Sequence, residues 1–181
     1  MTFYTFYIEK KVGNHVIYFD NSATTQVHPE VLKVYKKVNQ KFIGNPSRLH
    51  QLGDQSHELL ESARKQVAEL LNVKQEEIYF TSSGTEGDNW LIKGTAMEKM
   101  RFGKHIITTQ IEHPAVAESL NQLEKLGFEI TRLPVNNQGL ISIEDLKDAI
   151  RPDTILATFI AVNNEMGAIQ PLEEISEVFE E

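Results

Sequence analysis

The chain has 181 residues, with 18 Lys and Arg against 26 Asp and Glu, a formal charge of −8 and 40% hydrophobic residues. At roughly 150 residues per domain this length fits one domain or part of a larger one, and the hydrophobic content excludes a disordered chain. The acidic balance argues against a nucleic-acid partner, which needs Lys and Arg to displace counterions from phosphates. The sequence contains no cysteine, which excludes disulfides, thiolate metal sites and a cysteine nucleophile within these residues.

The N-terminal sequence lacks the pattern of a secretory signal peptide. No positive charge precedes its short apolar stretch, and no small-residue cleavage site follows. The longest mostly apolar run, residues 155–162, is far shorter than the ~20 residues that a membrane helix requires. We therefore expect a cytoplasmic protein with no membrane partner.

Short β-branched and aromatic runs alternate with segments whose apolar residues recur every three to four positions. In chain order they predict a strand at 16–19, a helix from Pro29 to about 42, a helix through 59–71, a strand at 77–81, a helix over 85–100, a strand at 105–110, a helix over 114–126, a strand at 128–133, a helix over 143–150, a strand at 154–162 and a helix beginning near Pro171. This alternation predicts an α/β fold, a three-layer sandwich with a mostly parallel sheet. Ligands of such sheets bind at the carboxyl ends of the strands.

The first strand end of interest is Ser82-Ser83-Gly84-Thr85, which leads into the helix over 85–100. Free N–H groups at a helix start can bind a phosphate, Gly84 would let the anion come close, and Thr85 adds a hydroxyl. The alternative is an ordinary helix cap, since Ser and Thr caps are common. The sequence has neither G-x-x-x-x-G-K-[ST] nor G-x-G-x-x-G, so nucleotide sites lack their usual support.

The next strand end carries Glu112-His113-Pro114. The His113 imidazole can stack on a flat ligand or move a proton at neutral pH, which makes it a candidate catalytic residue. The alternative is a solvated loop histidine. His105 lies at the other end of the same strand, and we assign it no functional role.

A pair of amides, Asn163 and Asn164, follows the strand at 154–162. They can donate hydrogen bonds to a ligand oxygen or simply build a turn. Together the three strand ends would offer an anion cradle, a planar stacker and an amide donor. This combination suits a phosphorylated aromatic cofactor.

Five motifs, in order and spacing, resemble the cysteine desulfurases of the class V aminotransferase group. They are Asp20-Asn21-Ser22-Ala23-Thr24-Thr25, Gly44-Asn45-Pro46-Ser47 with His50, Thr81-Ser82-Ser83-Gly84-Thr85-Glu86 with Asn89, Glu112-His113, and Val162-Asn163-Asn164-Glu165-Met166-Gly167. The resemblance implies the N-terminal part of the large domain of a fold type I pyridoxal-phosphate (PLP) enzyme. It also implies a homodimer in the full-length enzyme, which converts L-cysteine to L-alanine and an enzyme persulfide, with a sulfur-acceptor protein as a further partner.

The resemblance also implies roles for single residues. Gly84 and Thr85 would hold the cofactor phosphate, His113 would stack on the pyridine ring, and Asn164 would contact the ring hydroxyl. Such enzymes use the sulfur for iron-sulfur clusters or for thiolation of transfer RNA, and the sequence does not distinguish these routes.

Three further residues, Asn21, Ala23 and Thr24, would lie near the substrate mouth in such enzymes. A turn selected for backbone geometry would give the same residue types. Family members usually begin just before the strand at 16–19, so we expect residues 1–15 to be an N-terminal extension and 16–181 to be a partial PLP-binding domain.

The chain departs from the family pattern in what it lacks. It has no Cys to receive sulfur, and none of its thirteen lysines follows the Ser-x-His string that marks the Schiff-base lysine of the family. We therefore expect this chain alone to be inactive, with the chemistry belonging to a longer enzyme. The alternatives are a non-catalytic remnant or binding module, and another class V member such as an aminotransferase or a selenocysteine lyase.

Overall fold

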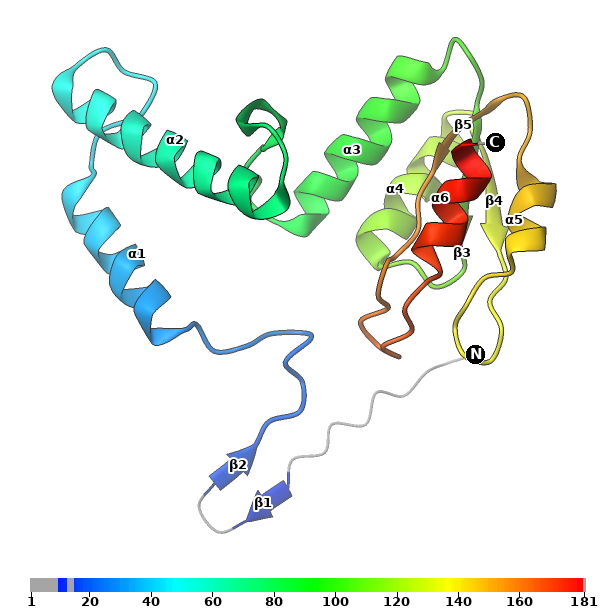
Figure 1. The fold of residues 1–181 in the computed structure, drawn as a ribbon, viewed down its shortest axis with the longest axis horizontal. Coiled ribbons are helices and arrows are strands. Elements are labelled where there is room, and N and C mark those ends of the chain that lie inside the picture. Colours follow the sequence, from blue (N-terminus) through cyan, green and yellow to red (C-terminus); the bar gives the residue numbers. More distant parts are fainter. Residues whose placement is uncertain (1–9, 13–14, 181) are drawn as a thin grey trace. The chain divides into compact units, whose positions relative to one another are not determined.

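The computed structural model describes residues 10–12 and 15–180 (Figure 1). The chain divides into two compact units, Met1–Phe80 and Thr81–Glu181. Residues 1–9 of the expected N-terminal extension lie outside the described residues. The division into an extension over 1–15 and one partial domain over 16–181 stays a prediction.

The first unit contains an antiparallel strand pair followed by two helices. Its elements are β1 (Lys10–Val12), β2 (His15–Ile17), α1 (Pro29–Lys41), α2 (Gln51–Leu71) and the 3₁₀ turn η1 (Gln75–Glu77). Both helices begin with a histidine cap. His28 Nδ1 accepts from Glu30 N at 3.3 Å before Pro29, and His50 Nδ1 accepts from Gly53 N at 3.1 Å. The caps satisfy N–H groups that the first helical turn leaves without a partner.

Close backbone contacts explain two glycines, one between α1 and α2 and one in the first turn of α2. A Cβ on Gly44 would lie 2.2 Å from the Leu52 carbonyl oxygen, and one on Gly53 would lie 2.1 Å from the Arg48 oxygen. Only glycine fits such distances. The Gly-Asn-Pro-Ser segment therefore has a structural reason for its glycine.

The expected strand at 77–81 is wrong. Residues 75–77 form η1, and residues 78–81 have no regular structure. A strand needs a neighbouring strand to satisfy its backbone groups, and within the described ranges 10–12 and 15–180 none pairs with 78–81. Arg64 on α2 instead donates to the Ile78 carbonyl oxygen and lies over the Phe80 ring.

The second unit is built on a parallel sheet of order β4-β3-β5. The strands are β3 (His105–Thr109), β4 (Glu129–Leu133) and β5 (Thr154–Ala157). The parallel sheet confirms the predicted α/β class. The expected strand at 154–162 is shorter in the structure, since β5 ends at Ala157. The last backbone hydrogen bond to β3 is the one that Thr158 N donates to Ile107 O.

Apolar side chains on the two faces of β3 give this unit its layers. Ile106 packs in one cluster with residues of α3 (Gly84–Lys99) and α4 (Pro114–Lys125). Ile107 packs in a second cluster with residues of α5 (Ile143–Ala149) and α6 (Leu172–Glu180). Because successive strand residues point to opposite faces, helices cover both sides of the sheet, as a three-layer sandwich requires.

His105 at the start of β3 has a structural role, as expected. Its side chain is fully buried, and its ring nitrogens lie 2.7 Å from the hydroxyls of Thr154 and Thr131 on the neighbouring strands. Burial lowers the pKa of this imidazole, and the positive charge of Arg151 lowers it further.

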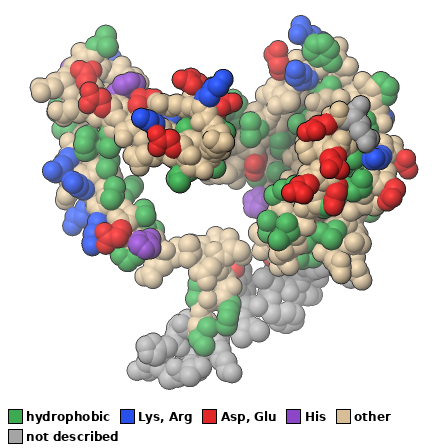
Figure 2. Space-filling view, in the orientation of Figure 1, with side chains coloured by type: hydrophobic (Ala, Val, Ile, Leu, Met, Phe, Trp, Pro, Cys, Tyr) green, Lys and Arg blue, Asp and Glu red, His purple; other side chains and the backbone are tan. Residues whose placement is uncertain are grey.

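The amphipathic helix α6 ends the described part of the chain. Its glutamates lie on the surface, where acidic side chains gather in Figure 2, while Ile175 is buried against the sheet. In the part of the chain that the structure describes, no helix is long and apolar enough to cross a membrane.

Candidate functional site

The start of α3 presents an exposed cap with open space in front of it. Ser83 is the N-cap, and its Oγ accepts from Glu86 N at 3.3 Å while its carbonyl accepts from Gly87 N. Gly84 and Thr85 precede the two residues that donate these bonds, and both are exposed. A helix leaves the N–H groups of its first residues without an intrahelical acceptor. Apart from its chain neighbours and the nearby backbone of α3 itself, no atom lies within 4 Å of the position that a Cβ on Gly84 would occupy. An anion can therefore approach this turn closely.

The Glu86 carboxylate braces the same turn. Its Oε2 accepts from Ser82 N at 2.6 Å and from Ser82 Oγ at 2.7 Å. Both hydrogen bonds lower the pKa of Glu86, and the one from the Ser82 hydroxyl has the larger effect. The ionised carboxylate thus fixes the loop that leads into Gly84.

His113 lies between β3 and α4, as the N-cap of α4 in front of Pro114. Its Nδ1 accepts from Ala115 N at 3.1 Å, which fixes the orientation of the ring. The side chain is exposed, so its faces and Nε2 are accessible to a ligand. The histidine is therefore a helix cap and at the same time an accessible imidazole.

The two neighbouring asparagines have different environments. Asn163 is 5% exposed and donates from Nδ2 to Ile111 O, while its Oδ1 accepts from Glu165 N and Met166 N. Asn164 is exposed, and its amide makes only a 3.2 Å contact with Glu165 Oε1 among the described residues. Asn163 is thus the structural member of the pair, and Asn164 is the one with an amide available to a ligand.

Glu112 is a residue whose role the sequence did not reveal. Its Oε1 accepts from Thr109 Oγ1 at 2.8 Å and from Ile160 N at 2.9 Å. The carboxyl group therefore joins the turn after β3 to the segment after β5. Burial raises the pKa of Glu112, and the charge of Asp88 on α3 adds to this increase.

These residues lie at one side of the parallel sheet. His113 and Asn164 follow the carboxyl ends of β3 and β5, which are neighbours in the sheet. The helix α3, which begins with Gly84 and Thr85, packs against α4 and β5. His113 and Asn164 thus follow neighbouring strands at one edge of the sheet, and Gly84 and Thr85 begin a helix that packs beside it.

Asn21, Ala23 and Thr24 belong to the first unit, in a turn after β2. Ala23 N and Thr24 N donate to Asp20 O, and Asn21 donates to Tyr18 O and accepts from Thr25 Oγ1. All three are exposed. Their hydrogen bonds account for the turn itself, and a substrate contact stays a prediction.

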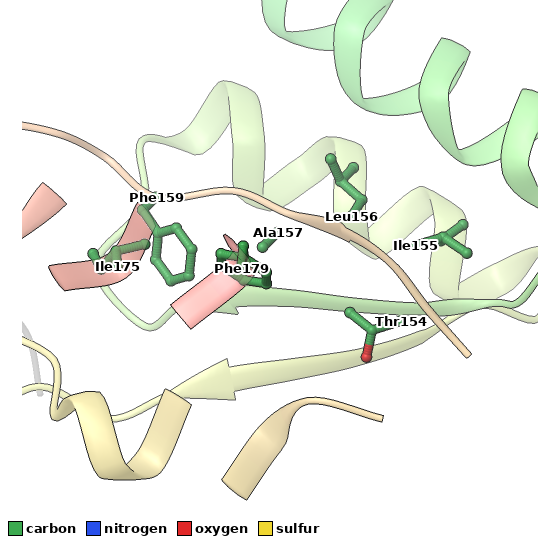
Figure 3. Close-up of a pocket in the computed structure, with 7 residues that line it drawn as sticks. All are labelled: Thr154, Ile155, Leu156, Ala157, Phe159, Ile175 and Phe179. Atoms are coloured by element: carbon green, nitrogen blue, oxygen red, sulfur yellow. The ribbon is translucent and has the colours of Figure 1, made fainter. Parts of the chain in front are cut away.

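A separate apolar groove runs along β5 and α6 (Figure 3). It is lined by Thr154, Ile155, Leu156, Ala157, Phe159, Ile175 and Phe179. None of these side chains is charged, and none belongs to the predicted site. Among the described residues there is also no group of three or more His, Asp or Glu that could hold a metal ion.

Comparison with known proteins identifies the family. Residues 17–181 match the family described as aminotransferase class-V. The chain belongs to this family. Class V aminotransferases are PLP-dependent enzymes, and the parallel sheet of the second unit agrees with membership of this family.

The most similar curated relatives include cysteine desulfurases. The chain is 57% identical over 163 residues to a NifS/IcsS protein homolog of Lactobacillus delbrueckii subsp. bulgaricus, and 47% identical over 168 residues to the cysteine desulfurase IscS of Methanosarcina thermophila. These matches cover 90% and 93% of the chain but 42% of each relative. The chain therefore spans less than half the length of these relatives, in agreement with the predicted N-terminal portion.

Solved structures give the same fold. A NifS-like protein superposes with a TM-score of 0.86 at 39% identity, covering 88% of this chain and 44% of that one. SspA in complex with cysteine superposes with a TM-score of 0.85 at 38% identity, covering 90% of this chain and 47% of that one. These neighbours confirm the predicted fold type I architecture.

Proposed function

We propose that this chain forms the phosphate-binding and ring-binding part of a PLP-dependent cysteine desulfurase. The supporting observation is that an open helix start, an accessible imidazole and an exposed amide follow one another around one parallel sheet, in a chain 57% identical to a NifS/IcsS homolog. The substrate would be L-cysteine and the products L-alanine and a persulfide. SspA, one of the structural neighbours, was solved in complex with cysteine.

The described residues fit PLP. Its phosphate would accept hydrogen bonds from the first-turn N–H groups of Gly84 and Thr85, where the space in front of Gly84 is open. The His113 ring would stack on the pyridine ring, and Asn164 would donate to the ring hydroxyl. When bound, PLP supplies an electron sink for charge that develops on the substrate. His113 would hold or move a proton at Nε2, since Nδ1 is occupied by Ala115 N.

Further features of the proposal concern the whole enzyme. The Lys after Ser-x-His that would anchor the cofactor and the Cys that would receive the sulfur are not among these 181 residues. Asn21, Ala23 and Thr24 would shape the substrate mouth, and a homodimer and a sulfur-acceptor protein would complete the system. A cytoplasmic location is part of the proposal, although relatives from Trachipleistophora hominis and Candida maltosa are named mitosomal and mitochondrial.

The test is a fusion of this chain to the remaining segment of the Lactobacillus relative. We expect the fusion to bind PLP, with its visible absorbance band, and to form alanine from L-cysteine in preference to selenocysteine. With a thiol reductant added to reduce the enzyme persulfide, it should also release sulfide. The separate 181-residue chain should release no sulfide. Absence of PLP binding by a folded fusion would favour a non-catalytic remnant, and a preference for selenocysteine or for an amino-group acceptor would favour another class V activity.

A histidine pair provides the matched variants. His113→Ala should lower kcat of the fusion about 10²- to 10⁴-fold, the usual contribution of a general acid or base. His57→Ala removes an exposed histidine on α2 and should leave kcat unchanged. Equal activity of the two variants would contradict the role of His113.

A further inference from the structure

Backbone hydrogen bonds connect β3 to β5 along the strands, and side chains replace them where the strands end. The two strands pair through backbone hydrogen bonds up to Thr158 N, which donates to Ile107 O. Beyond this point the segment after β5 leaves the ladder, and no strand pairing joins it to the turn after β3 within the described residues. Side chains have to make any further connection.

Glu112 makes the first of these side-chain connections. Its Oε1 accepts from Ile160 N, 48 residues away in sequence, and from Thr109 Oγ1 at the end of β3. Thr109 is 3% exposed, and its hydroxyl oxygen also accepts from Ile111 N at 3.2 Å. The turn after β3 is thus closed on itself and attached to the neighbouring segment by one carboxylate oxygen.

Asn163 makes the second connection, from Nδ2 to Ile111 O at 3.0 Å. The two attachment points on the segment after β5 are therefore Ile160 and Asn163. The two predicted ligand residues stand next to these attachments in sequence, His113 after Glu112 and Asn164 after Asn163. Glu112 and Asn163 thus connect the turn that carries His113 to the segment that carries Asn164.

The charge of Glu112 does not account for its presence. Burial raises the pKa of the carboxyl group and the Asp88 carboxylate adds to the rise, while the hydrogen bonds from Ile160 N and Thr109 lower it. The net change is a rise, so this position works against the charged form. In contrast, the acceptor oxygen satisfies a backbone N–H and a buried hydroxyl, and such groups are costly to leave without a partner. The Glu112 side chain is therefore useful at this position because its oxygen accepts hydrogen bonds.

We propose that Glu112 is a positioning residue, which fixes the His113 ring relative to the Asn164 amide by accepting hydrogen bonds from Thr109 and Ile160. This inference rests on the proposed function for its effect on the cofactor. It assigns to Glu112 no contact with the substrate or the cofactor. It predicts that a neutral side chain of the same shape works as well as the carboxylate.

The test compares Glu112→Ala with Glu112→Gln in the full-length fusion protein. The glutamine keeps an acceptor oxygen and loses the charge, while the alanine loses both. Glu118→Ala, which removes an exposed glutamate from α4, is the matched control. We expect Glu112→Ala to lower kcat about 10- to 100-fold through misplacement of the ligand groups. Glu112→Gln and the control should remain within about twofold of the parent protein.

Two readouts do not depend on turnover. The visible circular dichroism of bound PLP reports the asymmetry of its surroundings, and it should change in Glu112→Ala and be restored in Glu112→Gln. In the cofactor-free protein, hydrogen exchange of segments 109–114 and 158–166 should be faster in Glu112→Ala only. Identical behaviour of Glu112→Ala and the control, or equal impairment of the Gln and Ala variants, would overturn the proposal.

A second pair of variants keeps the test decisive if Glu112→Ala does not fold. Thr109→Val removes the hydroxyl donor to Glu112 at nearly constant volume, and Thr109→Ser retains it. The valine variant should reproduce the change in circular dichroism and the serine variant should not, and equal spectra would overturn the proposal. Failure of the proposed function is distinguishable, because the parent fusion would then show no PLP band at all.

Discussion

Replacement of Asn163 or Asn164 by alanine should separate two adjacent, chemically identical residues. Asn163 is 5% exposed and makes hydrogen bonds of 3.0 Å to Ile111 O, 3.0 Å from Glu165 N and 2.9 Å from Met166 N. Alanine makes none of them. At about 0.5–1.5 kcal/mol net for each bond, Asn163→Ala should lower the free energy of unfolding by about 1.5–4.5 kcal/mol.

Asn164→Ala should have the opposite profile. Because Asn164 is exposed and makes one side-chain contact in the structure, the free energy of unfolding should change by less than about 0.5 kcal/mol. If its amide contacts the cofactor, the same variant should weaken PLP binding by the full-length fusion. Asn164→Ala is thus the matched control for the loss of stability expected of Asn163→Ala.

Urea unfolding followed by tryptophan fluorescence measures the difference. The chain has a single tryptophan, Trp90, on α3 in the same compact unit as the two asparagines. Its signal therefore reports the unfolding of the relevant unit. Unfolding free energies that agree within 0.5 kcal/mol for the two variants would refute the distinction between a buried structural amide and an available one.

Three further predictions concern the stability of the second unit. Burial lowers the folded-state pKa of His105 below its unfolded value of about 6.5. The neutral ring therefore contributes stability above pH 6.5 that is lost as the pH falls through the folded pKa. The urea midpoints measured at pH 7 and at pH 5 should differ less in His105→Gln than in the parent protein. Leu120→Ala, at a fully buried position, should cost about 2–5 kcal/mol in the same urea assay. Gly139→Ala should lower the thermal midpoint, because Gly139 has a φ of +80° and the new Cβ would lie 2.9 Å from Ala168 Cβ; an unchanged midpoint would contradict this.

The helices and the central sheet could be predicted because their signals are local. Pro29 and Pro114 stand at the first turn of α1 and α4, as the sequence indicated. Apolar spacing gave the buried face of α4, whereas α1 has no buried residue in the structure. The strand at 77–81 could not be judged in the same way. Its β-branched and aromatic residues are typical of a strand, but a strand also depends on a neighbour that lies elsewhere in the sequence.

The sequence indicated which residue types to expect in the candidate site, but not which of them have a structural role. Asn163 and Asn164 are the same residue side by side, and only burial reveals which amide is used inside the protein. The function of Glu112 depends on Ile160, 48 positions further along, and no local pattern signals such a bond. The same bond explains why β5 is shorter than its apolar run, since Ile160 N pairs with a carboxylate and not with a strand.

The helix cap formed by His113 determines which nitrogen of the neutral imidazole carries the hydrogen. Nδ1 accepts from Ala115 N, so the neutral ring carries its hydrogen on Nε2. Towards a ligand the neutral side chain is therefore a donor. To take up a proton at Nε2 the ring must first place a hydrogen on Nδ1, which removes the capping bond and exposes Ala115 N at the start of α4. At about 0.5–2 kcal/mol for a lost cap, the first turn of α4 favours the tautomer that presents Nε2–H as a hydrogen-bond donor.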